Sequence, residues 1–247
     1  MKVVFHYDFY EVYASEPAAA PGRMEAIIDC LGKKFDMLYA TAAEPEAIEA
    51  VHTDRHIDYV RGLGLYNIAA LAAGGAIKAA SLGLTEPAFA VIRPPGHHAS
   101  RDDSWGFCYF NNMAVALTRL MMSGQIKTAS VLDFDLHYGD GNVNILSGNS
   151  DVKLHNPPES NRKSYLRGVE TFLNAHQVDM IGVSAGFDHH VDDWGGLLTT
   201  EDYFDMGQMV KEAAKKMGAG YFGILEGGYN HSVLGQNVLA MINGMSD

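Results

Sequence analysis

The chain alternates between short, almost continuously apolar runs and longer segments in which apolar residues recur with the period of a helix. The short runs contain few charged residues, which is typical of parallel strands covered on both faces. The first longer segment places Met24, Ile27 and Leu31 on one face of a predicted helix. The pattern predicts strands at Val3–Tyr7, Phe89–Arg93, Ala129–Phe134, Asp151–His155, Met180–Ser184 and Tyr221–Leu225, and helices after Pro21 and at Pro45–Arg61, Tyr66–Leu82, Asn112–Met122, Arg162–His176, Glu201–Met217 and Ser232–Ile242.

The repeated passage from strand to helix predicts an α/β fold with a three-layer, doubly wound and mainly parallel sheet. No linker or low-complexity segment interrupts it, so we expect residues 1–247 to form a single domain. In such sheets, ligands bind beyond the carboxyl ends of the strands. Polar clusters follow four predicted strands, namely PPGHH at 94–98, DLHYGD at 135–140, AGFDHH at 185–190 and EGGYN at 226–230. We expect these clusters to meet in one crevice.

The composition indicates a folded, acidic protein that does not bind nucleic acid. Of its 247 residues, 47% are hydrophobic and 19% charged, which excludes a disordered chain. Thirty acidic against 18 basic residues give a net charge of −12, which offers no cationic surface to a phosphate backbone but is compatible with a cationic ligand. Cys30 and Cys108 are too few for a disulfide framework or a thiolate zinc site, so His and carboxylates must hold any metal.

No segment has the pattern of a signal peptide or a membrane span. The N-terminal residues include Asp8 and Glu11, and the apolar stretch 68–84 contains Lys78. We therefore expect a soluble, cytoplasmic protein with no membrane partner. The sequence carries no signal for an oligomeric state.

One segment places three ionisable residues on the same side of a predicted strand. In VLDFDLH, residues 131–137, a strand period of two puts Asp133, Asp135 and His137 on one face. Charged groups buried without partners would destabilise the fold, so this face favours a bound cation. Two carboxylates and an imidazole suit zinc or iron(II). A solvated strand end is the alternative, which the apolar flanking run disfavours.

Adjacent histidines, His97 and His98, follow the rigid segment 94–96 at another strand end. Because imidazole titrates near neutral pH, one of them is a candidate to take a proton from an attacking water and return it to a leaving amine. Asp133 and Asp140 are candidate carboxylate partners that would orient the two rings. In isolation the pair also fits a loop with two exposed rings, and the neighbouring ionisable strand favours the catalytic interpretation.

Two further residues complete a candidate site. Asp188 follows the predicted strand at 180–184 and would supply a third metal ligand, although a turn cap would place an Asp there equally well. Tyr229 follows Gly227 and Gly228, and its phenol is a candidate donor to a developing oxyanion. Without the other clusters, an ordinary buried tyrosine would be the better interpretation.

Five motifs taken together resemble the histone deacetylase superfamily. They occur in the family's order: PPGHHA at 94–99, GFCYFNN at 106–112, DFDLHYGDGN at 133–142, SAGFD at 184–188 and LEGGYN at 225–230. The likeness is greatest to class II-like bacterial and archaeal members and to acetylpolyamine amidohydrolases. It extends from about His52 to the C-terminus, and more loosely to Val3 and Arg23.

The resemblance implies a zinc-dependent deacetylase with an arginase-like α/β fold. It alone decides which histidine transfers the proton. By position in the motifs, the metal ligands are Asp135, His137 and Asp188; the general base and acid is His98, with His97 beside it; their partners are Asp140 and Asp133; the oxyanion donor is Tyr229; and the substrate channel includes Gly106, Phe107 and Gly227.

The sequence also departs from the family's pattern. Residues 65–68 replace a longer loop that carries an acidic, substrate-gripping residue, and residues 156–166 replace the segment with the second channel aromatic, which predicts a shallower channel. Trp194 stands where a Pro is common, and Gly195 near where the polyamine-selective branch has a Glu. Lys153 stands where many members have a Ser of a structural potassium site, so we hypothesise that its ammonium replaces that ion beside Asp133 and Asp135.

The leading prediction is therefore zinc-dependent removal of an acyl group, above all acetyl, from an acyl-lysine, a polyamine or another small N-acetylated amine. Iron(II) would suit the same ligands. One alternative is a binuclear-metal ureohydrolase, which would need further Asp and His ligands between two ions. The other is a non-catalytic protein that binds acylated amines.

Overall fold

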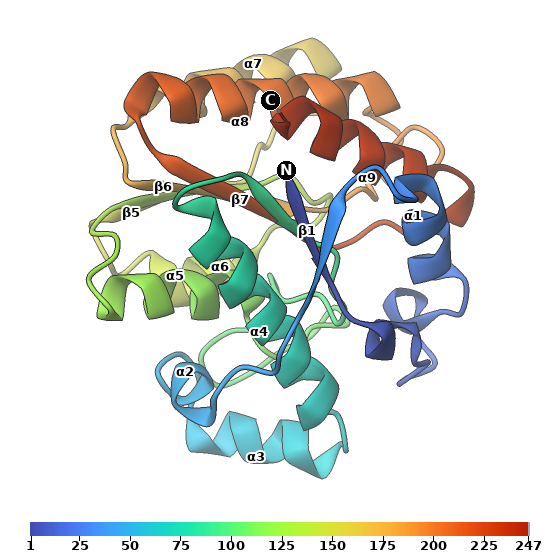
Figure 1. Ribbon diagram of the computed structural model, residues 1–247, viewed down its shortest axis with the longest axis vertical. Coiled ribbons are helices and arrows are strands. Elements are labelled where there is room, and N and C mark those ends of the chain that lie inside the picture. The colour runs from blue at the N-terminus through green and yellow to red at the C-terminus, as the bar shows by residue number, and fades with distance from the viewer. Residues whose placement is uncertain (247) are drawn as a thin grey trace.

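A wholly parallel sheet forms the middle layer of the structure, a computed structural model that describes residues 1–246 (Figure 1). Its seven strands lie in the order β2-β1-β3-β7-β6-β4-β5. Each strand is only three to six residues long, and every residue of the interior strands β3, β4 and β6 is buried, as are all of β7 except its first. The strands are β1 (Lys2–Phe5), β2 (Asp36–Tyr39), β3 (Ala88–Ala90), β4 (Ala129–Asp133), β5 (Val152–His155), β6 (Met180–Ala185) and β7 (Gly220–Leu225).

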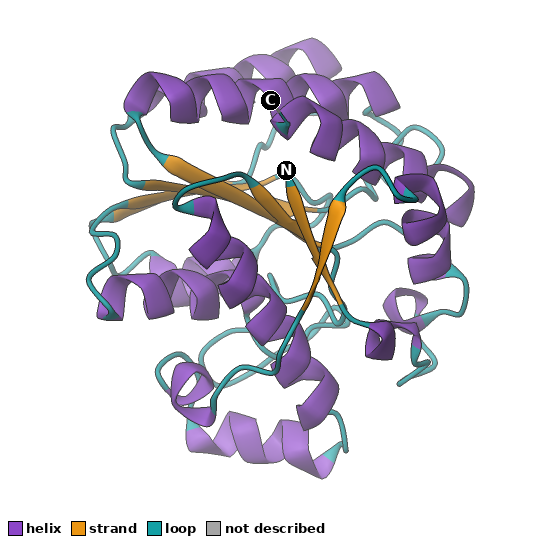
Figure 2. Cartoon of the chain, viewed as in Figure 1, coloured by secondary structure: helices purple, strands orange, loops and turns teal. Residues whose placement is uncertain are grey.

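Helices cover both faces of this sheet (Figure 2). On one face α4 packs against α5, and on the other α8 packs against α7 and α9, and α9 against α1. Within residues 1–246, no helix combines the length and the hydropathy that a membrane span requires. The helices are α1 (Arg23–Leu31), α2 (Pro45–Glu49), α3 (Asp54–Gly62), α4 (Tyr66–Gly83), α5 (Asn112–Met122), α6 (Asp140–Leu146), α7 (Arg162–Ala175), α8 (Thr200–Met217) and α9 (His231–Met245).

The predicted α/β class with a doubly wound, three-layer parallel sheet is confirmed, and all six predicted strands are present within a few residues. Strand β2 was not predicted, because an edge strand with three exposed residues has no continuous apolar run. The predicted helix at 45–61 is wrong as one element: it divides into α2 and α3, and Thr53 Oγ1 caps the second by accepting from His56 N. Helix α6 was also missed.

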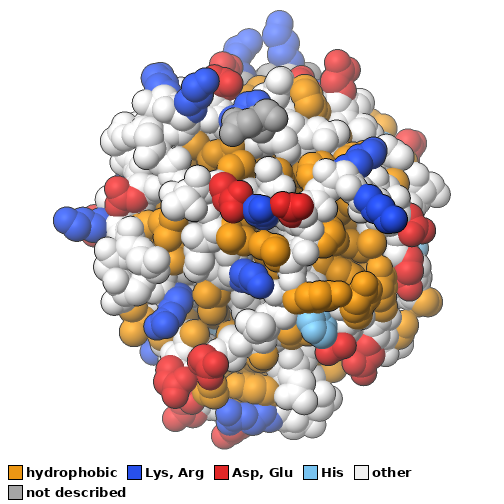
Figure 3. Space-filling view, in the orientation of Figure 1, with side chains coloured by type: hydrophobic (Ala, Val, Ile, Leu, Met, Phe, Trp, Pro, Cys, Tyr) orange, Lys and Arg blue, Asp and Glu red, His pale blue; other side chains and the backbone are white. Residues whose placement is uncertain are grey.

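Exposed apolar side chains accompany the edge strand, on a face of the molecule where apolar side chains are visible among charged ones (Figure 3). Tyr7, Met37 and Tyr39 are each more than one third exposed and line a small hollow beside β2. Because these side chains are exposed, β2 has no continuous apolar run in the sequence, which is why the strand was not predicted.

The strand order brings the four polar clusters together. The strands that precede them, β3, β7, β6 and β4, are consecutive neighbours in the sheet. Because all are parallel, their carboxyl ends lie at one edge, where a ligand site is expected. Hydrogen bonds then join the clusters: Gly227 N donates to Asp135 Oδ2, and Leu136 N donates to Asp188 Oδ1. The predicted meeting of the clusters is confirmed.

A buried histidine, His52, ties the loop that carries His97 and His98 to the start of α5. Its ring is 1% exposed; Nδ1 lies 2.9 Å from Ser100 O, and Nε2 accepts from Asn111 N at 2.9 Å. Burial, with the nearby His56, lowers the pKa of His52 to about 3. The ring therefore stays neutral in the fold, because protonating Nε2 would leave two donors facing each other.

This pair of bonds predicts a loss of stability in mild acid. The folded pKa is below the unfolded value of about 6.5, so below pH 6.5 the unfolded chain binds a proton that the folded chain excludes. Between pH 7 and pH 5, wild type should lose about 2 kcal/mol more unfolding free energy than His52→Asn, measured by urea titration. The exposed His176→Asn variant is the control and should follow wild type. Equal losses in all three proteins would contradict this role.

Candidate active site

Asp135, His137 and Asp188 form a group that could hold a metal ion. Their candidate ligand atoms all lie within 4.8 Å of one another. His137 Nδ1 lies 3.1 Å from Asp188 Oδ2 and 3.3 Å from Asp135 Oδ1, and both carboxylates are buried. Two buried carboxylates on one imidazole make a compact anionic site that a divalent cation would neutralise.

The sequence argument that put Asp135 and His137 on one face of a strand is partly wrong. Strand β4 ends at Asp133, so Asp135 and His137 lie on a bend and not on a strand face. What holds them is the loop backbone, because His137 N donates to Asp135 Oδ1 at 2.9 Å. The assumed strand period of two therefore identified Asp135 and His137 as neighbours, but a hydrogen bond within the bend brings them together.

Two glycines, Gly227 and Gly186, allow their backbone to approach the Asp135 carboxylate closely. Gly227, assigned to the substrate channel from the sequence, donates its N–H to Asp135 Oδ2 at 2.9 Å. A Cβ at Gly227 would lie 2.5 Å from that oxygen, and one at Gly186 would lie 2.0 Å from it. Both positions require glycine because a larger residue would displace the carboxylate. The structure thus gives Gly227 a supporting contact that the motif alone did not reveal.

The two adjacent histidines each face the carboxylate expected from the sequence. His97 Nδ1 lies 3.3 Å from Asp133 Oδ2, and His98 Nδ1 lies 2.6 Å from Asp140 Oδ1. The centres of the two rings lie 3.9 Å apart with 39° between their planes, and the His98 ring lies 5.9 Å from that of His137. With Nδ1 bound to a carboxylate, Nε2 of His98 is left for proton transfer, while Nε2 of His97 lies 3.7 Å from Asp135 Oδ2.

The surroundings give the two imidazoles opposite proton affinities. Burial and the neighbouring charge of His97 lower the pKa of His98 to about 4, although Asp140 acts against them. Burial also disfavours charge on His97, but the Asp135 and Asp133 carboxylates outweigh it and raise the pKa of His97 well above its ordinary value. At neutral pH the arrangement thus holds a neutral His98 beside a charged His97, a division typical of an acid and base pair.

A buried glutamate that the sequence reasoning missed lies behind the pair. Glu226 Oε2 accepts from Gly96 N at 2.7 Å and from His97 N at 3.3 Å, and its other oxygen accepts from Ser184 Oγ. Asn142 Nδ2 links Ser184 to Asp133 in the same network. Burial raises the pKa of Glu226 to about 7. Its place in the EGGYN cluster was the available signal, but nothing in the sequence showed which way its side chain points.

Tyr229 lies among aromatic rings at the mouth of the site. Phe107, with φ of +68°, packs edge-on against it at 5.8 Å, and Trp194 stacks on it at 4.1 Å. Asp193 Oδ2 accepts from both Tyr229 N and Asn230 N, which fixes the backbone of the tyrosine loop. Burial and the carboxylates of Asp135 and Asp188 raise the pKa of Tyr229, so the phenol keeps its proton.

Gly106 places the neighbouring segment against the site. Its φ is +60°, and a Cβ there would lie 2.4 Å from His98 Cδ2. Only glycine leaves room for the His98 ring, so this predicted channel residue also sets the position of the histidine. Trp105 precedes it and contacts His98, a contact that the sequence reasoning did not anticipate.

A family model described as a histone deacetylase domain matches residues 63–165 and 150–245, which is most of the chain. The chain belongs to the histone deacetylase family. A probable deacetylase from Methanothermobacter thermautotrophicus is 28% identical over 98% of this chain and 90% of its own length. A histone deacetylase-like amidohydrolase from Pseudomonas aeruginosa is 26% identical, covering 94% of this chain and 79% of its own. These relatives support a hydrolase of the deacetylase type.

A solved structure supports the same family. The crystal structure of the HDA15 HD domain is similar with a TM-score of 0.85 and 26% sequence identity. The likeness covers 98% of this chain and 88% of that one. The chain thus has the deacetylase and arginase-like fold that the motifs implied.

The hypothesis that Lys153 replaces a structural potassium ion is wrong. The Lys153 ammonium donates to Ser150 O at 2.7 Å, and Lys153 pairs with Ser130 along the neighbouring strands β5 and β4. Ser130, its partner in β4, lies three residues before Asp133, and Ser150 precedes β5. The ammonium therefore points toward the amino end of the sheet, away from the site. The Lys153 side chain thus binds the backbone just before its own strand, and it does not reach Asp133 or Asp135.

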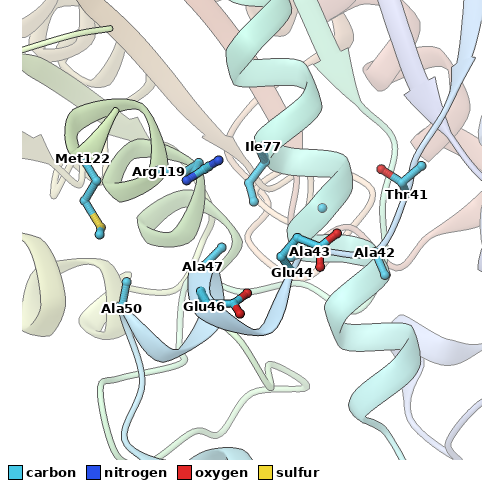
Figure 4. A pocket seen from close by; sticks show the side chains of 11 residues that line it. Thr41, Ala42, Ala43, Glu44, Glu46, Ala47, Ala50, Ile77, Arg119 and Met122 are labelled. Carbon is cyan, nitrogen blue, oxygen red and sulfur yellow. The ribbon is translucent and has the colours of Figure 1, made fainter. Parts of the chain in front are cut away.

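Several surface hollows lie away from the candidate active site. One hollow of about 500 Å³ lies between α2, α4 and α5, with Ala47, Ile77, Arg119 and Met122 around it (Figure 4). None of its lining residues is a candidate site residue, and it has no group of metal-ligating side chains. The convergence of titratable groups, and not the size of a hollow, therefore locates the chemistry.

Proposed function

We propose that this protein is a zinc-dependent amidohydrolase that removes an acetyl group from an N-acetylated amine. The observation that carries the proposal is the approach of a two-Asp, one-His group to two histidines, each of which has its own carboxylate. This combination places an electrophile site beside a proton acceptor, as amide hydrolysis requires.

The residues present fit a zinc ion. Asp135, His137 and Asp188 supply three protein ligands of the types zinc accepts, which leaves a position open, as in catalytic sites. Iron(II) accepts the same donors, so metal analysis must decide between them. When bound, the ion would polarise the amide carbonyl and make water more acidic.

The two histidines divide the proton transfers. His98 is neutral at pH 7 and presents Nε2, so it accepts the proton of the attacking water while Asp140 steadies Nδ1. It then returns that proton to the leaving amine nitrogen. His97 stays charged between Asp133 and Asp135 and supplies positive charge next to the reacting carbonyl.

Tyr229 supports the developing oxyanion. Its phenol keeps its proton at neutral pH and is held by Trp194, Phe107 and the Asp193 contacts to the backbone. A protonated donor fixed in place before the reaction stabilises the charge without reorganising.

These roles need no second metal ion. Among residues 1–246, the group of Asp135, His137 and Asp188 is the sole cluster that could hold a metal ion. This disfavours the binuclear ureohydrolase.

Shortened loops favour small or flexible substrates. By the resemblance, residues 65–68 replace a longer loop that carries a substrate-gripping acidic residue, and residues 156–166 replace the segment with the second channel aromatic. The net charge of −12 is compatible with an amine product. We therefore propose an acetyl-lysine side chain, an acetylated polyamine or a similar small N-acetylamine as substrate.

A substrate panel tests the proposal. Zinc-loaded protein is incubated with acetyl-lysine peptides, acetylpolyamines and simple N-acetylamines, and released acetate is measured. We expect turnover of at least one class, abolished by a chelator and restored by zinc. A His98→Ala protein with the same metal content is the control for contaminating activity. Metal binding without release of acetate from any substrate would favour the non-catalytic alternative.

A further inference from the structure

An exposed tryptophan, Trp105, contacts both members of the His98 and Asp140 pair. Its ring lies 3.9 Å from the His98 ring, with 31° between their planes. Its indole Nε1–H donates a 2.8 Å hydrogen bond to Asp140 Oδ2, the oxygen that His98 does not use. The stacked ring restricts the tilt of the imidazole, and the hydrogen bond restricts rotation of the carboxylate.

The backbone places Trp105 in this position. Ala99 and Ser104 form an antiparallel bridge, and Ser100 N donates to Asp103 O at 2.8 Å, so the chain turns back over His98. The turn delivers a side chain that is 54% exposed and still makes two directed contacts. Its two directed contacts, and not packing into the core, hold the ring in this position.

We propose that Trp105 is a positioning residue for proton transfer by His98. This inference rests on the proposed function. The Asp140 side chain is 42% exposed, so water would otherwise compete for its carboxylate. With Oδ2 held by the indole, Oδ1 stays directed at His98 Nδ1, and Nε2 stays directed at the substrate. The ring also covers His98, which is only 3% exposed although it borders the mouth.

Steady-state kinetics tests this role. Trp105→Phe keeps a ring but lacks the N–H donor, and we expect kcat to fall about tenfold with KM within about twofold. Trp105→Leu lacks both contacts and should lower kcat about a hundredfold. In an Asp140→Ala background, Trp105→Phe should have no further effect, because its partner is gone. Tyr39→Leu, which removes an exposed aromatic ring from β2, should match wild type.

Two results would overturn the inference. One is a Trp105→Phe protein whose kcat is within twofold of wild type. The other is an equal loss from Trp105→Phe with and without Asp140, which would show that the tryptophan acts independently of that carboxylate.

A spectroscopic measurement separates this inference from the proposed function. The chain has two tryptophans, Trp105 and Trp194, so an NMR spectrum of indole N–H groups contains two signals. The signal that disappears in Trp105→Phe should move upfield in Asp140→Ala and stay unchanged in the exposed control Asp151→Ala. This readout needs no turnover. If the Trp105 indole signal does not move in Asp140→Ala, the inference is wrong even if the enzyme is active. If the signal moves but the protein releases no acetate, only the proposed function is wrong.

Discussion

Asp188→Asn is expected to lose its metal and at least about 10³-fold in turnover. Asp188 is fully buried, and its two oxygens are engaged by Leu136 N and His137 Nδ1. Asparagine has almost the same volume but removes the charge, so one of two carboxylates that would offset a divalent cation is gone. Metal content by elemental analysis and acetate release measure the two effects.

The control for this substitution is Asp151→Asn, an exposed aspartate that precedes β5 at the opposite end of the sheet. It should keep wild-type metal content and turnover. If Asp188→Asn kept both as well, the Asp135, His137 and Asp188 group would not be the metal site. Thermal unfolding of both variants shows whether the fold survives the change.

Tyr229→Phe is expected to lower kcat by about 10²- to 10³-fold while leaving metal content and KM close to wild type. The phenylalanine ring can keep the stack on Trp194 and the contact with Phe107, so only the hydroxyl donor is removed. A donor that matters only when negative charge develops affects kcat and not ground-state binding. Steady-state kinetics on the best substrate of the panel gives the two constants.

Tyr59→Phe removes a hydroxyl from an exposed tyrosine on α3 and should be neutral. Unchanged turnover in Tyr229→Phe would remove this residue from the mechanism. A rise in KM with unchanged kcat would instead assign Tyr229 to substrate binding.

The sequence was sufficient to place the chemistry at one edge of the sheet. Strands β3, β4, β6 and β7 lie in the interior of the sheet, so their apolar runs are clear in the sequence, and unusual polar residues follow each within a few positions. Parallel strands share one carboxyl edge, which makes such clusters converge without any knowledge of the contacts. Convergence also brings Asp133 and Asp140 near the two histidines, but the pairing of Asp140 with His98 came from the resemblance to the family.

Features that depend on exposure or side-chain direction could not be predicted. Strand β2 is half exposed, and α6 contains Gly141 and two asparagines, so neither shows a clear apolar period. Lys153 stands at the family's potassium position, yet its direction depends on Ser150, which no pattern reveals. Trp105 gave no signal because its importance comes from two contacts across a turn.

We propose that one divalent ion, held by Asp135, His137 and Asp188, makes this chain an N-acetyl hydrolase. The most direct measurement strips the protein with a chelator, adds zinc in small steps and follows acetate release against bound metal. We predict no release without metal and a linear rise that saturates at one ion per chain. Full release by stripped protein, or saturation only at two ions per chain, would contradict the claim.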